Sequence, residues 1–159
     1  MEEKKLAIIA TKGSLDWAYP PFILASTAAA LGYETQIFFT FYGLQLLRKK
    51  LNLKVTPLGN PGMPMPMGMD KWFPVLLTAL PGMEAMMTSM MKKKMASKGV
   101  ASLEELRDLC QEADVKMIAC QMTVDLFDMD PAEFIDGVEY GGAALFFEFA
   151  GESDICLYI

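Results

Sequence analysis

Three cysteines and the complete absence of histidine define the chemistry open to this chain of 159 residues. Without histidine the chain lacks the commonest general base and the commonest zinc ligand, and it cannot form a Cys–His or Ser–His catalytic pair. Any reaction must therefore use Cys, Lys, Asp, Glu, Tyr or backbone groups. The sequence predicts neither a metal site nor a cofactor.

Cys120 is the cysteine best placed for chemistry. It directly follows Val115 to Ala119, an apolar run that is typical of a buried strand. Sites in open parallel sheets form outside the carboxyl ends of the strands. Thr123 belongs to a segment that could open a helical turn, whose amide groups would stabilise a thiolate on Cys120.

Charged residues near this predicted edge act in opposite directions on the thiol. Lys12 and Gly13 follow the first apolar run, so they reach the same edge, where the ammonium group of Lys12 would favour the thiolate. Asp125 and Asp128 would raise the thiol pKa. The sequence alone leaves the net direction open. Lys12-Gly13-Ser14 also has too few glycines for a phosphate-binding loop.

The other two cysteines are more typical of structural positions. Cys110 lies on the apolar face of a helix with Leu103 and Leu106, so we expect it to face the core. The five strand residues that separate it from Cys120 correspond to about 16 Å, which is beyond disulfide reach. Cys156 lies within the last apolar run, where we expect a small buried side chain.

Alternating apolar and helical patterns predict an α/β fold with a five-stranded, mostly parallel sheet and helices on both faces. The predicted helices include 20–31, 42–51, 82–96, 102–112 and a Gly-interrupted helix over 139–150. We expect one domain spanning residues 1–159. The predicted strands are 6–10, 34–40, 53–58, 115–119 and 155–158.

A methionine-rich segment over about residues 60–99 interrupts this pattern as an insertion in the third crossover. Its alternating Met-x-Met pattern could supply thioether ligands to copper(I). It could instead form an adaptable apolar lid or an oligomer contact, which is the preferred interpretation. A membrane-spanning helix would have to tolerate two prolines, so an interfacial or buried helical hairpin is favoured. The predicted lid or interface residues are Met63, Met65, Met67, Trp72 and Phe73.

Composition narrows the class of protein further. The chain is 53% hydrophobic and carries a net charge of −6, without a long basic stripe, so nucleic acid is not an expected partner. An odd, small number of cysteines argues against a disulfide framework and for a reducing compartment. No signal peptide is visible, and we therefore expect a cytoplasmic location.

Several segments together resemble the DsrE/DsrF-like family, and specifically its DsrE2 branch. They are Thr11-Lys12-Gly13-Ser14-Leu15-Asp16, Gly59-Asn60-Pro61-Gly62-Met63-Pro64, Leu80-Pro81-Gly82-Met83, and the Cys110–Cys120 pair. The resemblance implies a DsrE-like α/β sandwich, often a homo-oligomer, that traffics sulfur as a cysteine persulfide. It places the family's active cysteine at Cys120 and the branch's second cysteine at Cys110.

The resemblance suggests an intracellular sulfur carrier, or a sulfurtransferase-like protein, that exchanges sulfur with donor and acceptor proteins. The alternative is a non-enzymatic module that docks to a partner or membrane protein through the methionine-rich insertion. We also expect a homo-oligomer that buries part of residues 72–91, because a small monomer would leave much of that apolar surface exposed.

Overall fold

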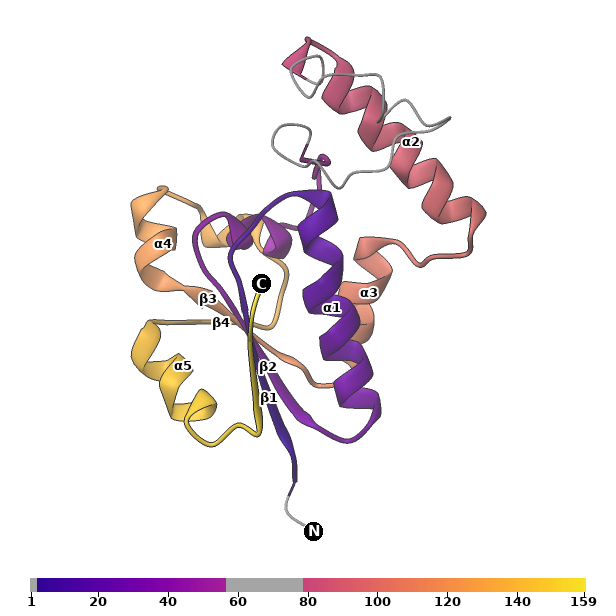
Figure 1. Ribbon diagram of the computed structural model, residues 1–159. Helices are drawn as coiled ribbons and strands as arrows, with labels where there is room; N and C mark the ends of the chain where they lie inside the picture. The colour runs from indigo at the N-terminus through magenta and orange to yellow at the C-terminus, as the bar shows by residue number, and fades with distance from the viewer. Residues whose placement is uncertain (1–2, 57–78) are drawn as a thin grey trace. The chain divides into compact units, whose positions relative to one another are not determined.

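The computed structural model describes residues 3–56 and 79–159, which contain one five-stranded sheet (Figure 1). Every pair of neighbouring strands is parallel, and the strand order is β4-β3-β2-β1-β5. The predicted α/β class with a parallel sheet is therefore confirmed. The strands are β1 (Lys5–Ala10), β2 (Glu34–Phe39), β3 (Lys116–Cys120), β4 (Val138–Gly141) and β5 (Ile155–Tyr158).

Helices cover both faces of the sheet, as expected. On one face, the ring of Phe22 in α1 lies 6.0 Å from that of Phe39 in β2, and the Cys110 thiol of α3 donates to the carbonyl of Phe22. On the other face, Phe146 of α5 packs against Phe38 of β2. The helices are α1 (Leu15–Ala30), α2 (Met83–Ser97), α3 (Leu103–Glu112), α4 (Gln121–Leu126) and α5 (Ala143–Ala150), with 3₁₀ turns η1 (Phe41–Leu47) and η4 (Pro131–Glu133).

Two of the predicted elements are wrong, although the described residues do contain five strands. Residues 53–56 of the expected third strand have no regular structure, because the Val55 amide donates to the Thr88 hydroxyl at 3.0 Å and the Thr56 amide to Asp16. The missing strand is β4, within a segment predicted to be helical. β4 ends at Gly141 and Gly142 is the N-cap of α5, and glycine is a poor residue for the interior of the predicted helix.

These corrections also move other assignments. The strand that ends at Cys120 is the third in chain order, and residues 60–99 lie in the connection between β2 and β3. The predicted helix over residues 42–51 is the shorter 3₁₀ helix η1. Residues 57–78 lie outside the described residues. They include the first part of the methionine-rich segment and all of the predicted lid or interface residues.

The chain divides into two compact units. One comprises Met1–Gly13, Trp17–Asn52 and Ser102–Ile159 and contains the whole sheet, while the other comprises Ser14–Asp16 and Leu53–Ala101. Within the second unit, the hydroxyl of Thr88 in α2 donates to the Glu84 carbonyl at 2.8 Å and accepts from Val55. The expectation of a single domain stays a prediction.

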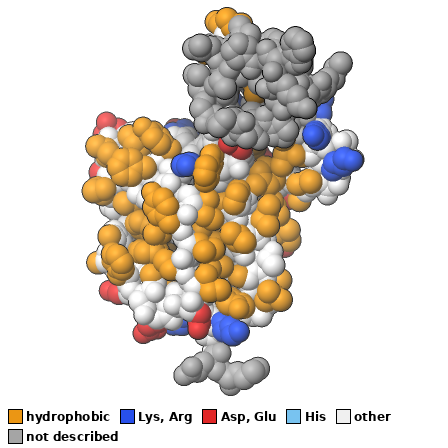
Figure 2. All heavy atoms as spheres, viewed as in Figure 1, with side chains coloured by type: hydrophobic (Ala, Val, Ile, Leu, Met, Phe, Trp, Pro, Cys, Tyr) orange, Lys and Arg blue, Asp and Glu red, His pale blue; other side chains and the backbone are white. Residues whose placement is uncertain are grey.

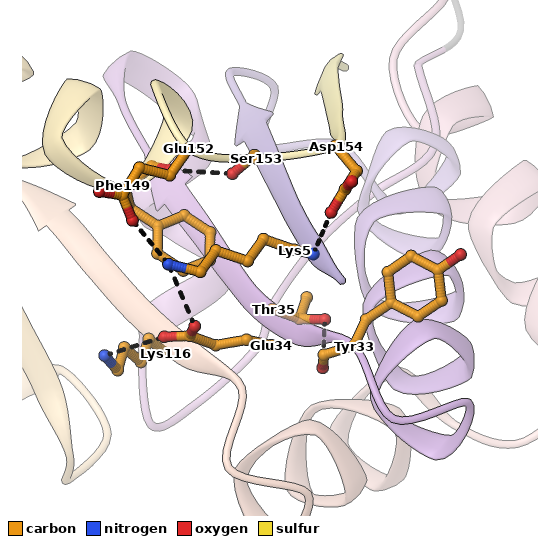
Figure 3. A network of polar contacts seen from close by, with 9 residues as sticks. All are labelled: Lys5, Tyr33, Glu34, Thr35, Lys116, Phe149, Glu152, Ser153 and Asp154. Carbon is orange, nitrogen blue, oxygen red and sulfur yellow. Dashed lines mark hydrogen bonds and ion pairs between the residues drawn. The ribbon is translucent and has the colours of Figure 1, made fainter. Parts of the chain in front are cut away.

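A chain of ion pairs links β1, β2 and β3 with the turn that precedes β5 at the amino edge of the sheet (Figure 3). The Lys5 ammonium lies 2.8 Å from the Glu152 carboxylate and 3.6 Å from that of Glu34, and Glu34 also pairs with Lys116. The Lys5 amide donates to Asp154 at 2.7 Å. Side-chain hydrogen bonding raises the pKa of Lys5 and lowers that of Glu152. These ion pairs therefore hold the amino ends of the strands together, at the edge of the sheet opposite the one that carries Cys120.

No helix among the described residues is both long and apolar enough to cross a lipid bilayer.

Candidate active site around Cys120

Cys120 is the last residue of β3 and lies at the carboxyl edge of the sheet, as the sequence predicts. It is paired with Gly141 of β4 and directly precedes α4. Only 5% of its surface is exposed, and it belongs to the apolar cluster formed with Ile118 and Phe146 on the α5 face. Cys120 is therefore sheltered at the end of a strand and is not a freely exposed loop thiol.

Hydrogen-bond donors favour the charged form of this thiol. Burial raises the pKa of Cys120, but hydrogen bonds from the Thr123 hydroxyl and amide, the Thr40 hydroxyl and the Met122 amide outweigh burial, and the net pKa is lowered. Met122 and Thr123 lie in the first turn of α4, the helical turn that the sequence indicated after Cys120. Cys120 is therefore a shielded thiol with raised thiolate character.

The Thr123 hydroxyl is held so that its proton faces a restricted set of acceptors. Its side chain is completely buried, and its Oγ1 accepts from the Phe41 amide at 3.3 Å. Because a backbone amide can only donate, this contact uses an oxygen lone pair and leaves the hydroxyl proton for the Cys120 sulfur or for Thr40 Oγ1, which is 3.3 Å away.

Backbone strain contributes to this arrangement. Phe41 has a φ of 49°, in the left-handed region that bulky side chains rarely adopt. In this conformation the Phe41 amide reaches Thr123, whereas the preceding residue, Thr40, has an extended backbone at the end of β2. The cost of this conformation, of the order of 1–3 kcal/mol, must be offset by the surrounding packing.

Two glycines allow the connections after β1 and β2 to pack closely beside the site. A Cβ on Gly13 would lie 2.5 Å from the Tyr42 carbonyl oxygen, and one on Gly43 would lie 2.1 Å from that of Ala10. Both obstructing atoms belong to the backbone, so they cannot move aside as a flexible side chain would. Gly13 thus helps to position η1 behind Thr40, a structural role that the phosphate-loop comparison could not indicate.

Lys12 does not point at Cys120. Its ammonium group lies 3.3 Å from the centroid of the Trp17 ring, a cation–π contact at the start of α1. The strand β2 lies between β1 and β3, so about 10 Å of sheet separates the strand that leads to Lys12 from the strand that ends at Cys120. Any influence of Lys12 on the thiolate is therefore through space.

The remaining cysteines occupy contrasting environments. Cys110 is fully buried in α3, and burial raises the pKa of its thiol to about 12, so the expected core position is confirmed. Cys156 lies in the edge strand β5 and is exposed, which differs from the buried position expected. β5 lies at one end of the strand order and pairs only with β1 among the described strands. All three thiols are free.

Comparisons with known proteins show the family of the chain. Residues 2–158 match the model of the DsrE/DsrF/DrsH-like family. The chain belongs to that family. Within it, the chain is 87% identical to the sulfur carrier protein DsrE2 of Allochromatium vinosum, and the match covers all of both chains. The resemblance to the DsrE2 branch is therefore confirmed.

Two more distant matches extend the comparison. The uncharacterised protein YrkE of Bacillus subtilis is 32% identical, with 99% of this chain and 98% of that protein covered. The crystal structure of YchN from E. coli superposes with a TM-score of 0.55 at 12% identity and covers 98% of this chain and 99% of YchN. This structural likeness shows the shared DsrE-like fold.

The sequence identified Cys120 and Thr123 but missed Thr40 and Phe41. Thr40 follows the apolar run 37–39, so the rule that placed Cys120 at a strand end could also have placed Thr40 at that edge. What the sequence does not contain is the strand order, which makes β2 and β3 neighbours. Among the described residues, no group of His, Cys, Asp and Glu side chains is arranged to hold a metal ion.

Proposed function

We propose that this chain is a sulfur carrier that holds a persulfide on Cys120 and passes the sulfur to a partner protein. The observation that supports the proposal most strongly is the environment of Cys120, a thiol of lowered pKa beside the buried Thr123, the partly buried Thr40 and helix-start amides. The 87% identical relative is named a sulfur carrier protein. A carrier needs a nucleophilic thiolate and shelter for the bound sulfur, and both features are present in this part of the fold.

Loading requires only the Cys120 thiolate and a donor that carries sulfane sulfur. The thiolate attacks the outer sulfur of a donor persulfide, a new S–S bond forms, and the donor leaves as a thiolate that keeps the electron pair of the broken bond. No net oxidant or reductant is consumed. The same hydrogen-bond donors that favour the thiolate of Cys120 before loading favour it again when it is the leaving group during discharge.

Cys110 is a poor candidate for a second sulfur site. Its thiol is fully buried among apolar side chains, donates to the Phe22 carbonyl at 3.4 Å, and has a pKa of about 12. Few molecules would carry a thiolate there at neutral pH. We propose that Cys110 stabilises the packing of α3 on α1.

We also propose that the carrier works in a reducing compartment such as the cytoplasm, and that it assembles as a homo-oligomer.

Intact-mass spectrometry tests this proposal. After exposure to a polysulfide donor, the wild-type protein should gain about 32 Da, the mass of one sulfur, whereas Cys120→Ser should not gain this mass at low donor concentration. Cys110→Ser should load normally but melt at a lower temperature, because a hydroxyl replaces a buried thiol. Normal loading of Cys120→Ser would reject Cys120 as the carrier. An absence of loading in every variant would favour the docking-module alternative.

A further inference from the structure

Three aromatic side chains form an exposed rim beside Cys120. Phe41, Tyr42 and Phe127, which we call the aromatic rim, are 45%, 64% and 40% exposed. The rings of Tyr42 and Phe127 stack with centroids 5.8 Å apart, and Phe41 contacts both edge-on. Exposed apolar patches commonly mark contact sites on proteins, and aromatic residues are enriched at such sites. This group of exposed rings is therefore a candidate contact site.

The rim is tied directly to the candidate active site. Phe41 follows Thr40, and its amide donates to Thr123 Oγ1, the hydroxyl that favours the Cys120 thiolate. Phe127 ends the six-residue helix α4, which begins directly after Cys120, so about 9 Å of helix separates the two ends. A partner that covers the aromatic rim would therefore reach the mouth of the site.

Charge around the rim indicates what kind of partner fits. Two acidic residues lie on the side of the rim that Phe127 occupies: Asp125 in α4 and Asp128 just beyond it, both exposed. The segment from Lys116 to Asp130 that contains α4 has no basic residue after Lys116. Figure 2 shows hydrophobic side chains gathered around the position of α4, with acidic side chains at the outline beside them. This surface would attract a basic partner and repel an acidic one.

We propose that the aromatic rim and the acidic residues around it are the docking surface for a basic acceptor protein that carries a reactive cysteine. The inference rests on the proposed function of Cys120. The acceptor thiolate attacks the outer sulfur of the Cys120 persulfide, that S–S bond breaks, and Cys120 leaves as a thiolate with the electron pair. The acceptor departs as a persulfide, so atoms and charge balance.

The test uses a second leaving group, so that it does not depend on persulfide loading. In the Cys156→Ser protein, Cys120 is labelled with thionitrobenzoate from Ellman's reagent, and its release by peptide thiols is followed by absorbance. Two peptides are compared, each with one cysteine and one phenylalanine, flanked by three lysines or by three glutamates. At low salt the lysine peptide should react about ten-fold faster, and the difference should shrink in high salt.

Matched variants separate docking from the intrinsic reactivity of each peptide. Asp128→Asn should lower the lysine-to-glutamate rate ratio at least about two-fold, because unit charges roughly 10 Å apart in water contribute about that factor for each pair. Asp114→Asn is the control. Asp114 resembles Asp128 in its backbone, because both follow a helix with a positive φ, 57° for Asp114 and 48° for Asp128. Asp114 differs in position, because it precedes β3 at the amino edge of the sheet. It should leave the ratio unchanged.

The aromatic rim has a control of its own. Tyr42→Ser should slow the lysine peptide about two- to ten-fold, the range expected for loss of one aromatic pair. Tyr158→Ser removes a tyrosine that is 75% exposed on β5 and should have no effect. Equal rates for the two peptides, equal effects of the paired variants, or a Cys120 that cannot be labelled would overturn the docking surface. A normal peptide preference with no persulfide loading would instead reject only the carrier function.

Discussion

Replacing Thr123 by valine removes the hydroxyl that favours the Cys120 thiolate while keeping the shape of the side chain. A hydrogen bond to a charged group contributes about 1.5–3 kcal/mol. The Met122 and Thr123 amides and the Thr40 hydroxyl remain as donors, so the lower end of that range applies. A loss of about 1.4 kcal/mol corresponds to a factor of ten, so at neutral pH Cys120 in Thr123→Val should react about ten-fold more slowly with iodoacetamide.

The pH profile distinguishes this electrostatic role from a structural one. The pKa of Cys120 is lowered in the folded protein, so the hydroxyl matters only where the thiol is partly protonated. Wild type and Thr123→Val, both in a Cys156→Ser background, should therefore differ at neutral pH and converge in alkaline solution. Thr123→Ser, which keeps the hydroxyl, should restore most of the rate. Alkylation is measured by mass spectrometry of the Cys120 peptide between pH 5 and 10.

A matched threonine provides the control. Thr35 is 3% exposed, and its hydroxyl donates to the Tyr33 carbonyl at 3.2 Å at the amino end of β2. Thr35→Val should change stability without changing the alkylation profile of Cys120. A Thr123→Val protein that reacts like wild type at every pH, or that is slower by the same factor at every pH, would refute the proposed action of the hydroxyl on the sulfur.

Further predictions concern packing and pH. The pKa of Cys110 is about 12 in the folded protein against an ordinary value of 9.0, so as the pH rises the Cys110 thiol ionises first in the unfolded chain. The free energy of unfolding should therefore fall by up to about 1.4 kcal/mol per pH unit between pH 9 and 12. Urea titrations at alkaline pH should show that Cys110→Ala lacks this contribution. Glu152 has a lowered pKa, so Glu152→Gln should reduce the melting temperature at pH 7, with the difference vanishing as pH falls below 4.5. Gly43→Ala should destabilise the fold by more than about 3 kcal/mol because its Cβ would meet the Ala10 carbonyl, whereas Gly142→Ala meets nothing within 4 Å; equal urea midpoints would contradict this.

Much of the sheet could be predicted because its central strands are short, continuously apolar runs that end at polar or glycine residues. Such runs form β1, which ends at Ala10, β2, which ends at Phe39, and β3, which includes Ala119. β4 could not be recognised in this way, since Val138–Gly141 is short and leads into the apolar residues of α5, so the combined stretch has the pattern of one helix. At residues 53–56 of the strand predicted over 53–58, hydrogen bonds to Thr88 and Asp16 are present in place of strand pairing, and local sequence patterns do not reveal such distant partners.

The candidate site was predictable only in the part that is local to Cys120. The position of the thiol at a strand end, and the amides that follow it, depend on neighbouring residues in the chain. Thr40 contacts Thr123 across 83 positions of sequence, so its role depends on the adjacency of β2 and β3. The net direction of the Cys120 pKa was left open by the sequence, because hydrogen bonds from both threonines decide it against the effect of burial.

The central claim is tested most directly by asking where sulfur goes when the three cysteines of the wild-type protein compete. The folded protein is exposed briefly to one equivalent of polysulfide, trapped with an alkylating agent and digested, and the persulfide on each cysteine peptide is measured by mass spectrometry. Exposure alone would favour Cys156, whereas the chemical environment favours Cys120, which is only 5% exposed. We predict that most of the sulfur is on Cys120; sulfur mainly on Cys156 or Cys110, or on none of the three, would contradict the account.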